Sequence, residues 1–384
     1  MKLDGIRVLD LTQFLPGPHL TMTMADHGAD VIKVEAPPLG DPGREIGLRQ
    51  GGETVFFRNT NRGKRSIRLD LKQEADRSIL LQLVDWADVL VESFRPGVAE
   101  RLGFGVDAVR TRNPRIVYCS ISAFGQSGPY RDVPAHDLAI QALSGTVSVN
   151  RGPDDAPAMP GVPAADMAAS LMGLSAILMA LLRREKTGVG DHIDLAMHDA
   201  LVAWLPNVLG PVFAEERAPI PKHERTWGGS AFYQIYETAD GRHVVLGAQE
   251  IKFVRRLLGE LGRSEYVALC EQGPGSHQQP VIEFLRQTFK TRTRVQWVDY
   301  FAGMDVSFAP VNTLLEALDD PQVIARSMVM TDEMGHRHLG APIKFADEPA
   351  CPTLRIPSLD EHGSEIRSFL AMASPSAPGK TLAN

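Results

Sequence analysis

Cysteine is scarce in this chain of 384 residues, which contains only Cys119, Cys270 and Cys351. A sparse, odd set of cysteines that lie far apart offers neither a disulfide framework nor a zinc site, and it fits a reducing compartment. Basic charge is not in excess either, because 40 Lys and Arg residues stand against 47 Asp and Glu residues, for a net charge of −7. That balance argues against a nucleic-acid-binding protein.

Long apolar runs are also missing. The first residues, MKLDGIRVLDLTQF, are charged early and never build the apolar core of a signal peptide. The longest apolar run, from Met167 to Leu182, includes Ser170, Gly173 and Ser175, and it is shorter than the roughly 20 residues that span a bilayer. We therefore expect a buried helix there, no membrane partner and a cytoplasmic location.

The motifs of the common cofactor and nucleophile classes are absent. The chain has no G-x-x-x-x-G-K-[ST], H-E-x-x-H, C-x-x-C or G-x-S-x-G sequence. Gly103-Phe104-Gly105 is only a fragment of a dinucleotide-binding fingerprint. We therefore expect no metal ion and no nucleotide redox cofactor.

What the chain does contain is an alternation of short apolar, β-rich runs with helical periods. The strand-like runs are 6–11, 29–35, 89–92 and 116–121, and the helical stretches are 19–26 and 74–86. This alternation predicts an α/β fold with a parallel sheet. Loops follow the strands at 14–18, 37–44, 93–98 and 123–129. Since ligands of such sheets bind outside the carboxyl ends of the strands, these loops are the expected binding region.

The second half of the chain has a different pattern. A long apolar helix is predicted over 166–184, and the Pro-, Gly- and charge-rich stretch 217–229 is typical of a linker. Residues 233–247 form two strand-like runs around Asp240-Gly241, a strong hairpin signal. We therefore expect a large domain over 1–216, completed by a return of 325–384, and a small domain over 217–324.

Several long stretches resemble the family III CoA-transferase superfamily, also called the CaiB/BaiF family, in the order typical of that family. The stretches are LDGIRVLDLTQFLPGP (3–18), GADVIKVEAPPLGDPGR (28–44), NRGKRSIRLDLK (61–72), ADVLVESFRPGVAERLGFG (87–105), AFGQSGPY (123–130), GVPAADMAASLMGLSAILMALLRREKTGVGDHIDLAMHDA (161–200) and YETADGRHVVLGAQE (236–250). The resemblance extends to about Pro342. It implies a large doubly wound, Rossmann-like α/β domain, a smaller α+β domain and an interlocked homodimer.

The resemblance also implies one of two chemistries on an acyl-CoA thioester. One branch of the superfamily transfers CoA between carboxylic acids through an aspartate nucleophile. The other branch, which contains the α-methylacyl-CoA racemases, moves the α-proton of a 2-methylacyl thioester between its two faces. Coenzyme A, carried as an acyl thioester, is thus the expected substrate in either case.

Three residues are the candidate catalytic groups. Asp166 matches the aspartate of the family, at the start of the long apolar helix, where the helix dipole favours an ionised carboxylate. Read locally, an Asp at that place is equally an ordinary N-cap. His136, 30 residues earlier, and Glu250 match the racemase pattern, in which the carboxylate orients the imidazole.

These matches lead us to expect racemase-type α-proton transfer by His136 and Asp166. A base must take the weakly acidic α-proton, and inversion requires a second proton carrier on the opposite face. The alternative is CoA transfer to an acceptor carboxylic acid through an aspartyl-CoA thioester on Asp166, a reaction that does not need His136.

Basic loop residues are expected to bind the phosphates of CoA, because the guanidinium fork suits phosphate oxygens. The candidates are Arg95, Arg101, Lys33, Arg44 and Arg65. For a residue such as Arg65, a solvated surface charge is about as good an explanation. The resemblance further implies that Gln13, Phe14 and Leu15 line the pantetheine channel.

Overall fold

A computed structural model of the chain describes residues 1–152 and 154–373 and divides into two compact units. The first unit contains Met1–Ser144, Gly161–Trp204 and the chain from Pro321 onwards, and the second contains Gly145–Pro160 and Leu205–Asp320. The first unit is therefore assembled from three separate stretches of sequence. Of the predicted return segment 325–384, residues 374–384 lie outside the described part.

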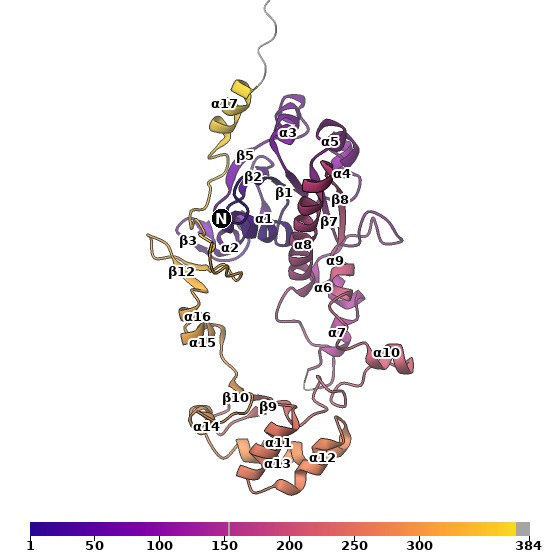
Figure 1. Cartoon of the computed structure of the whole chain (residues 1–384), viewed down its shortest axis with the longest axis vertical. Helices are drawn as coiled ribbons and strands as arrows, with labels where there is room; N and C mark the ends of the chain where they lie inside the picture. The colour runs from indigo at the N-terminus through magenta and orange to yellow at the C-terminus, as the bar shows by residue number, and fades with distance from the viewer. Residues whose placement is uncertain (153, 374–384) are drawn as a thin grey trace, which may run out of the picture. The chain divides into compact units, whose positions relative to one another are not determined.

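A six-stranded sheet forms the centre of the first unit (Figure 1). Every neighbouring pair of strands is parallel, which confirms the predicted α/β fold. In order across the sheet, the strands are β5 (Arg65–Arg68), β2 (Asp30–Glu35), β1 (Arg7–Leu11), β6 (Val89–Glu92), β7 (Val117–Ser122) and β8 (His192–Ala196).

The strand order reverses direction between β1 and β6. The chain adds β2 and β5 on one side of β1, and then β6, β7 and β8 on the other side. At such a switch point the loops after the two central strands diverge and leave a crevice at the carboxyl edge. The loops after β1 and β6 are therefore the first region to examine for a site.

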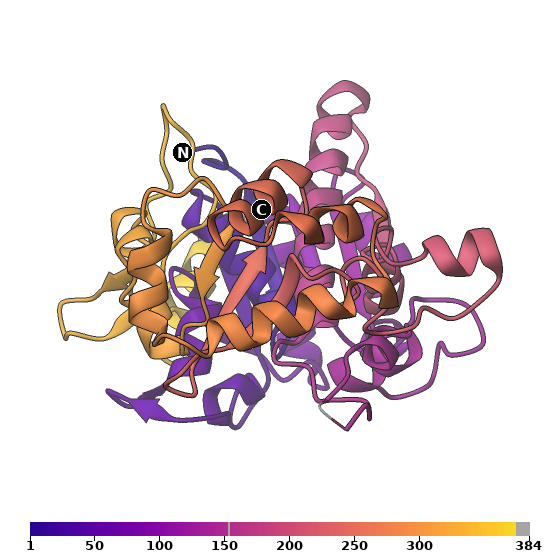
Figure 2. The ribbon, with the colours of Figure 1, turned by 90° about the horizontal axis from the view of Figure 1, so that it is seen from below.

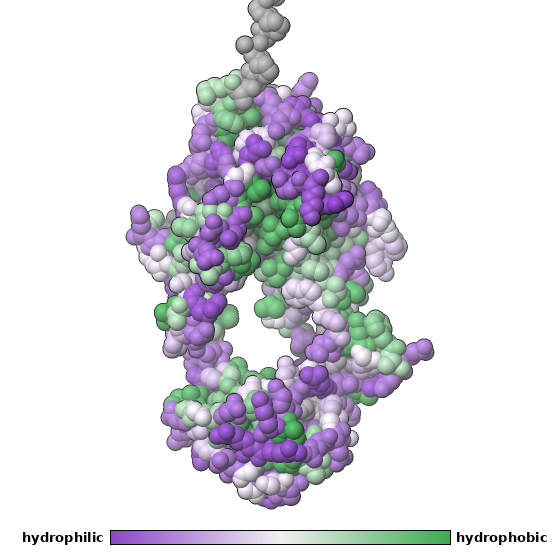
Figure 3. Space-filling view, in the orientation of Figure 1, coloured by the Kyte–Doolittle hydropathy of each residue, from purple (hydrophilic) through white to green (hydrophobic). Residues whose placement is uncertain are grey.

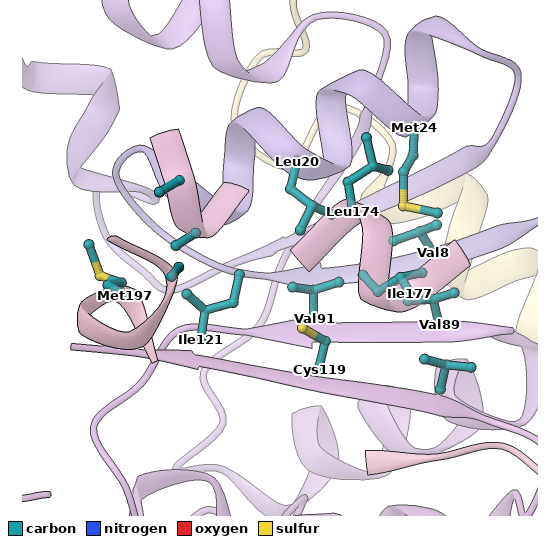
Figure 4. Packing of buried hydrophobic residues seen from close by; sticks show 14 of the residues in the cluster. Val8, Leu20, Met24, Val89, Val91, Cys119, Ile121, Leu174, Ile177 and Met197 are labelled. Atoms are coloured by element: carbon teal, nitrogen blue, oxygen red, sulfur yellow. The ribbon is translucent and has the colours of Figure 1, made fainter. Parts of the chain in front are cut away.

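The sheet is covered on both faces, which explains why nearly every residue of β1, β2, β6 and β7 is buried, without alternation. Helix side chains Leu20, Met24, Leu174 and Ile177 pack on one face, together with Val8 and other strand residues (Figure 4). The helices on this face are α1 (Pro16–Asp26), α8 (Ala164–Thr187) and α9 (Met197–Val202).

The opposite face of the sheet has its own core. Leu9 and Leu90 point there, although their neighbours Val8 and Val89 point to the first face. Leu83 packs in this core, and so does Ile366 from the end of the chain. The helices on this side are α3 (Glu74–Trp86), α5 (Val106–Arg112) and α17 (Gly363–Ala373).

Helix α8 is long and apolar enough, by length and composition alone, to cross a membrane. Its buried residues Ala169, Leu174, Ile177 and Leu181 nevertheless belong to the core on the sheet. It is thus a core helix of the first unit, as the sequence predicts, and it ends at Gly188, which takes the left-handed conformation of a helix C-cap.

The second unit has a three-stranded antiparallel sheet with helices on one side (Figures 1 and 2). The predicted hairpin is present, and Tyr236, Val244 and Leu246 of its strands pack against Leu257 and Leu285 of the helices. The elements are β9 (Tyr233–Glu237), β10 (His243–Gly247), β11 (Phe308–Pro310), α11 (Ile251–Glu260), α12 (Val267–Glu271), α13 (Gln279–Phe289) and α14 (Arg294–Phe301).

The remaining elements are short. Those of the first unit are β3 (Arg49–Gln50), β4 (Glu53–Thr54), α2 (Val55–Asn61), α4 (Val98–Arg101), α6 (Asp137–Leu143), α16 (Pro321–Ala325), β12 (Val329–Thr331) and β13 (Arg337–Leu339). Those of the second unit are α7 (Thr146–Val149), α10 (Gly210–Glu215) and α15 (Leu314–Leu318), and 3₁₀ turns lie at Pro42–Glu45, Ser264–Tyr266 and Ser276–Gln278.

Candidate functional site

The loops on either side of the switch point are joined by a hydrogen bond. The backbone N–H of Gln13, after β1, donates to Oγ of Ser93, after β6, at 3.0 Å. The predicted binding residues Gln13 and Arg95 therefore lie on adjoining loops at the carboxyl edge of the sheet. In the sequence, Gln13 and Ser93 are 80 residues apart, so the sequence does not reveal this contact.

Asp166 lies in the first turn of α8, near the same edge. A helix that links β7 to the parallel strand β8 must begin where β7 ends, because it runs back along the sheet. The helix starts at Ala164, so Asp166 is its third residue and not its N-cap. The N-cap position is occupied by Pro163, which contributes no side-chain hydrogen bond.

The missing cap comes from Asp137, at the start of α6. Its Oδ1 accepts the backbone N–H groups of Ala165 at 2.8 Å and of Asp166 at 3.2 Å. Its Oδ2 accepts Nε2 of Gln141 at 2.6 Å, which fixes the orientation of the carboxylate. Two of the four unpaired N–H groups at the start of α8 are thus satisfied by a side chain 28 residues upstream.

The electrostatics of Asp166 differ from the sequence-based expectation. Burial, and secondarily the negative charge of Asp137, raise the pKa of Asp166 to about 7. Asp166 is therefore only partly ionised at neutral pH, whereas the sequence position predicts a fully ionised carboxylate. Although a helix N-terminus favours charge, partial desolvation and a neighbouring carboxylate outweigh it here. Close to neutrality this carboxyl group exchanges readily between its two protonation states.

His136 is the residue that precedes Asp137, and it occupies the N-cap position of α6. Its exposed ring meets the ring of Phe14 edge to face, with centroids 6.0 Å apart and planes at 83°. Phe14 belongs to the loop after β1, so this contact connects the predicted pantetheine loop with the predicted catalytic segment. The structure thus brings Phe14, His136, Asp137 and Asp166 to one region of the first unit.

Glu250 belongs to the second unit, where it is the exposed residue before α11. Its carboxylate makes no side-chain cap to that helix. Its assignment as the partner of His136 therefore stays a prediction.

The roles of Arg95 and Arg101 as phosphate ligands stay predictions. Both are exposed, and neither guanidinium has an ion-pair or hydrogen-bond partner among the described residues. Arg65, by contrast, pairs with Asp30 at 2.6 Å and with Glu365 at 3.2 Å. Its side chain keeps 26% exposure, so it could reach a ligand only by leaving these partners.

The prediction that Lys33 and Arg44 bind phosphate is wrong, because the charge of each side chain is paired with a buried carboxylate. Lys33 is fully buried, and its ammonium pairs with Asp41 at 2.8 Å. Arg44 pairs with Glu35 at 2.7 Å and lies over the ring of Phe57, with 3.9 Å between guanidinium carbon and ring centroid. Neither side chain is free to bind a phosphate of CoA.

A cavity of about 270 Å³ lies at the ends of β7 and β8, in the predicted loop 123–129. Phe124, Tyr130, Asp194 and His198 are among its lining residues, and none of the candidate site residues is. Because none of the residues that match the family's site lines this cavity, it is not the reaction site that we favour. No group of three or more His, Cys, Asp or Glu side chains within 1–152 and 154–373 is placed to hold a metal ion.

Comparisons with known proteins agree with this fold. The model of CoA-transferase family III matches residues 3–363. The chain is 34% identical to an acetyl-CoA:oxalate CoA-transferase of Acetobacter aceti, over 96% of this chain and 95% of that protein. It is 32% identical to the succinyl-CoA:glutarate CoA-transferase of Mus musculus, over 88% of this chain and 78% of that protein. The crystal structure of a CaiB/BaiF family protein from Brucella suis superposes with a TM-score of 0.84 at 33% identity and covers 96% of this chain and 99% of that one.

Proposed function

The chain belongs to CoA-transferase family III, and we propose that it moves CoA from an acyl-CoA to a second carboxylic acid, with Asp166 as the nucleophile. The observation that carries this proposal is the setting of Asp166. Its carboxyl group stands in the first turn of α8, on a turn anchored by Asp137, near the carboxyl edge of the sheet.

The raised pKa of Asp166 suits a nucleophile. A carboxylate with a pKa of about 7 is more basic than an ordinary aspartate, and it is still substantially ionised at neutral pH. Attack of its oxygen on the thioester carbonyl forms a mixed anhydride and releases the CoA thiolate. The thiolate then attacks the aspartyl carbonyl, which gives an aspartyl-CoA thioester and frees the donor acid.

The second half of the cycle reverses these steps with the acceptor. The acceptor carboxylate attacks the aspartyl-CoA carbonyl and again releases the CoA thiolate. That thiolate attacks the acyl carbonyl of the new anhydride, which yields the product acyl-CoA and returns Asp166 as a free carboxylate. No proton at the α-carbon takes part, so His136 is dispensable for this chemistry.

The racemase reading, which the sequence pattern of His136 favours, is the weaker of the two. The curated relatives reported above are CoA-transferases, and this favours the alternative. His136 is instead assigned to the wall of the site, through its contact with Phe14. Because those relatives act on oxalate, succinate and glutarate, short dicarboxylic acids form the first panel of acceptors.

The exposed side of α8 supports an association with a second copy of the chain. Leu171, Met172, Leu178, Met179 and Leu182 are all exposed and recur at helical spacing. Hydrophobic surface is visible where α8 lies in the first unit (Figure 3). We propose that this apolar stripe of α8 is covered in a homodimer, the assembly that the family resemblance implies.

One experiment separates the two chemistries. The chain is incubated with a donor acyl-CoA and an acceptor acid labelled with ¹⁸O in its carboxylate, and the peptide that contains Asp166 is analysed by mass spectrometry. We expect ¹⁸O in Asp166 and an aspartyl-CoA adduct in the absence of acceptor. His136→Phe should keep transfer, and Asp166→Asn should lose it.

The racemase alternative is tested in the same preparation. A single-enantiomer 2-methylacyl-CoA is mixed with the protein in heavy water without any acceptor acid. Deuterium at the α-carbon that depends on both His136 and Asp166, with no label in Asp166 in the first experiment, would replace our proposal with the racemase function.

A further inference from the structure

Four buried charges alternate in sign beneath the loop after β1, and we call them the charged clasp: Lys64, Asp10, Lys33 and Asp41. Each is at most 4% exposed. Lys64 Nζ donates to Asp10 Oδ2 at 2.9 Å, Asp10 Oδ2 lies 3.9 Å from Lys33 Nζ, and Lys33 Nζ lies 2.8 Å from Asp41 Oδ2. Two positive and two negative groups leave the clasp neutral.

Neighbouring opposite charges favour the ionised states of Lys33 and Asp10. Burial alone would lower the pKa of Lys33, but the carboxylates of Asp10 and Asp41 raise it above its usual range. Burial would likewise raise the pKa of Asp10, whereas Lys33 and Lys64 lower it. Removing one partner would leave another charge buried and unpaired, which is strongly unfavourable.

Two hydrogen bonds connect the clasp to the backbone of the loop after β1. Oδ1 of Asp41 accepts the N–H of Phe14 at 3.2 Å, and Lys33 Nζ donates to the carbonyl of Thr12 at 2.8 Å. Phe14 has φ of 64°, a left-handed conformation that bulky residues rarely adopt. Its ring is 39% exposed, so packing of the ring in the interior does not explain this conformation.

We propose that Asp41, itself held by its ion pair with Lys33, positions the proposed active site by accepting the N–H of Phe14 and so holding Phe14 in the left-handed conformation that sets its ring against His136. This inference rests on the proposed function, because it assigns the loop to thioester binding. Asp41 and Lys33 touch no substrate and are positioning residues. This positioning role explains why Lys33 and Asp41, two charged residues of the stretch 28–44, are buried.

The mechanism predicts a specific kinetic signature. If the loop adopts its binding conformation only part of the time, the apparent dissociation constant rises by the inverse of that fraction. Chemistry at Asp166 is unchanged once the thioester is bound. Loss of the hydrogen bond from Phe14 to Asp41 should therefore raise KM for the donor acyl-CoA and leave kcat nearly constant, a split that general destabilisation of the fold would not produce.

The test compares two double variants that lack the same two charges. Lys33→Met/Asp41→Asn keeps a side-chain oxygen opposite the N–H of Phe14, and Lys33→Met/Asp41→Ala does not. We expect the Ala variant to raise KM about tenfold, with kcat within about twofold of wild type. Its Phe14 amide should exchange hydrogen faster in the full-length chain. The Asn variant should restore both values to near wild type, and equal KM and exchange in the two variants would overturn the proposal.

A second set of variants leaves the buried charges untouched, in case the double variants do not fold. Phe14→Pro removes both the N–H and the positive φ, whereas Phe14→Ala removes only the ring. KM should rise further in the Pro variant than in the Ala variant, and equal values would also overturn the proposal. If wild type transfers no CoA at all, the proposed function fails separately, and the exchange rate of the Phe14 amide still decides whether Asp41 holds the loop.

Discussion

The carboxylate of Asp137 accepts the backbone N–H of Asp166 at 3.2 Å, so one acidic side chain anchors the helix turn that presents another. The two effects of Asp137 on Asp166 oppose each other. Its hydrogen bonds stabilise the turn, and its charge makes ionisation of Asp166 less favourable. The proposed nucleophile is thus anchored by a group that, together with burial, raises its pKa.

Activity should rise with pH through about 7. Asp166, as the proposed nucleophile, must be ionised to attack, and its pKa is raised to about 7. We expect kcat/KM for CoA transfer to increase from pH 5.5 and to level off about one unit above that pKa. The measurement is a profile of kcat/KM with a donor and an acceptor whose own groups do not titrate in this range. A flat profile down to pH 5.5 would contradict the assignment.

Asp137→Asn should shift that profile to lower pH. The amide oxygen can still accept the N–H groups of Ala165 and Asp166. Burial still raises the pKa of Asp166, but the additional rise from the charge of Asp137 is gone. Asp137→Ala serves as the matched control, because it removes both the charge and the cap. The Ala variant should in addition lose about 1 kcal/mol of stability in urea denaturation. An unshifted profile in the Asn variant would exclude Asp137 as the electrostatic cause.

Asp166→Asn should stabilise the protein at alkaline pH. The pKa of Asp166 is about 7 in the folded chain and about 3.8 when unperturbed, so its contribution to stability is fully present below about 4 and is lost as the pH rises through 7. The Asn variant avoids this loss. We expect Tm to exceed that of wild type by about 2 °C at pH 8 and to match it below about pH 4, as measured by calorimetry. A difference independent of pH would point to packing instead.

Gly190→Ala should destabilise the first unit strongly. A Cβ at Gly190, just before β8, would stand 1.9 Å from the carbonyl oxygen of Ile116, and a backbone atom cannot rotate away. We expect a loss of about 3 kcal/mol or poor soluble yield. Gly210→Ala is the control, since no atom lies within 4 Å of its Cβ position. Equal midpoints of denaturation in the two variants would contradict the close approach.

Charge on the apolar stripe of α8 should separate the proposed dimer. Met179 and Leu182 are 65% and 68% exposed, so Met179→Glu/Leu182→Glu does not disturb the core of the first unit. We expect the molecular mass from light scattering to halve relative to wild type. Leu48→Glu, at a residue 84% exposed outside the stripe, should leave the mass unchanged. A wild-type chain that is monomeric would refute this assembly.

Elements with strong local signals were predictable from the sequence. The apolar period gave α3 with the bounds that the structure has, and the same holds for strand β6. Helix α14 also has a local sequence signal, because Thr293 and Gln296 form a capping box at its start. Local sequence patterns thus predict individual helices and strands, including most of those that border the site.

The site itself depends on contacts that no local pattern contains. The cap from Asp137 to α8 joins residues 28 and 29 positions apart, so only the folded chain reveals it. Lys33 follows apolar strand residues and reads like a surface ligand for phosphate, but Asp41 neutralises it in the interior. In the same way, burial around Asp166 reverses the effect that a helix N-terminus predicts.

The three-part composition of the first unit constrains the order in which a ribosome can complete it. Ile366 belongs to the core on the α3 side of the sheet, and the N–H of His362 donates to the carbonyl of Ser66 on the edge strand β5. The chain up to at least Ile366 must therefore be synthesised before this edge is closed. Until then the core on the α3 side of the sheet lacks Ile366 and Leu370, so this unit completes its folding at the β5 edge.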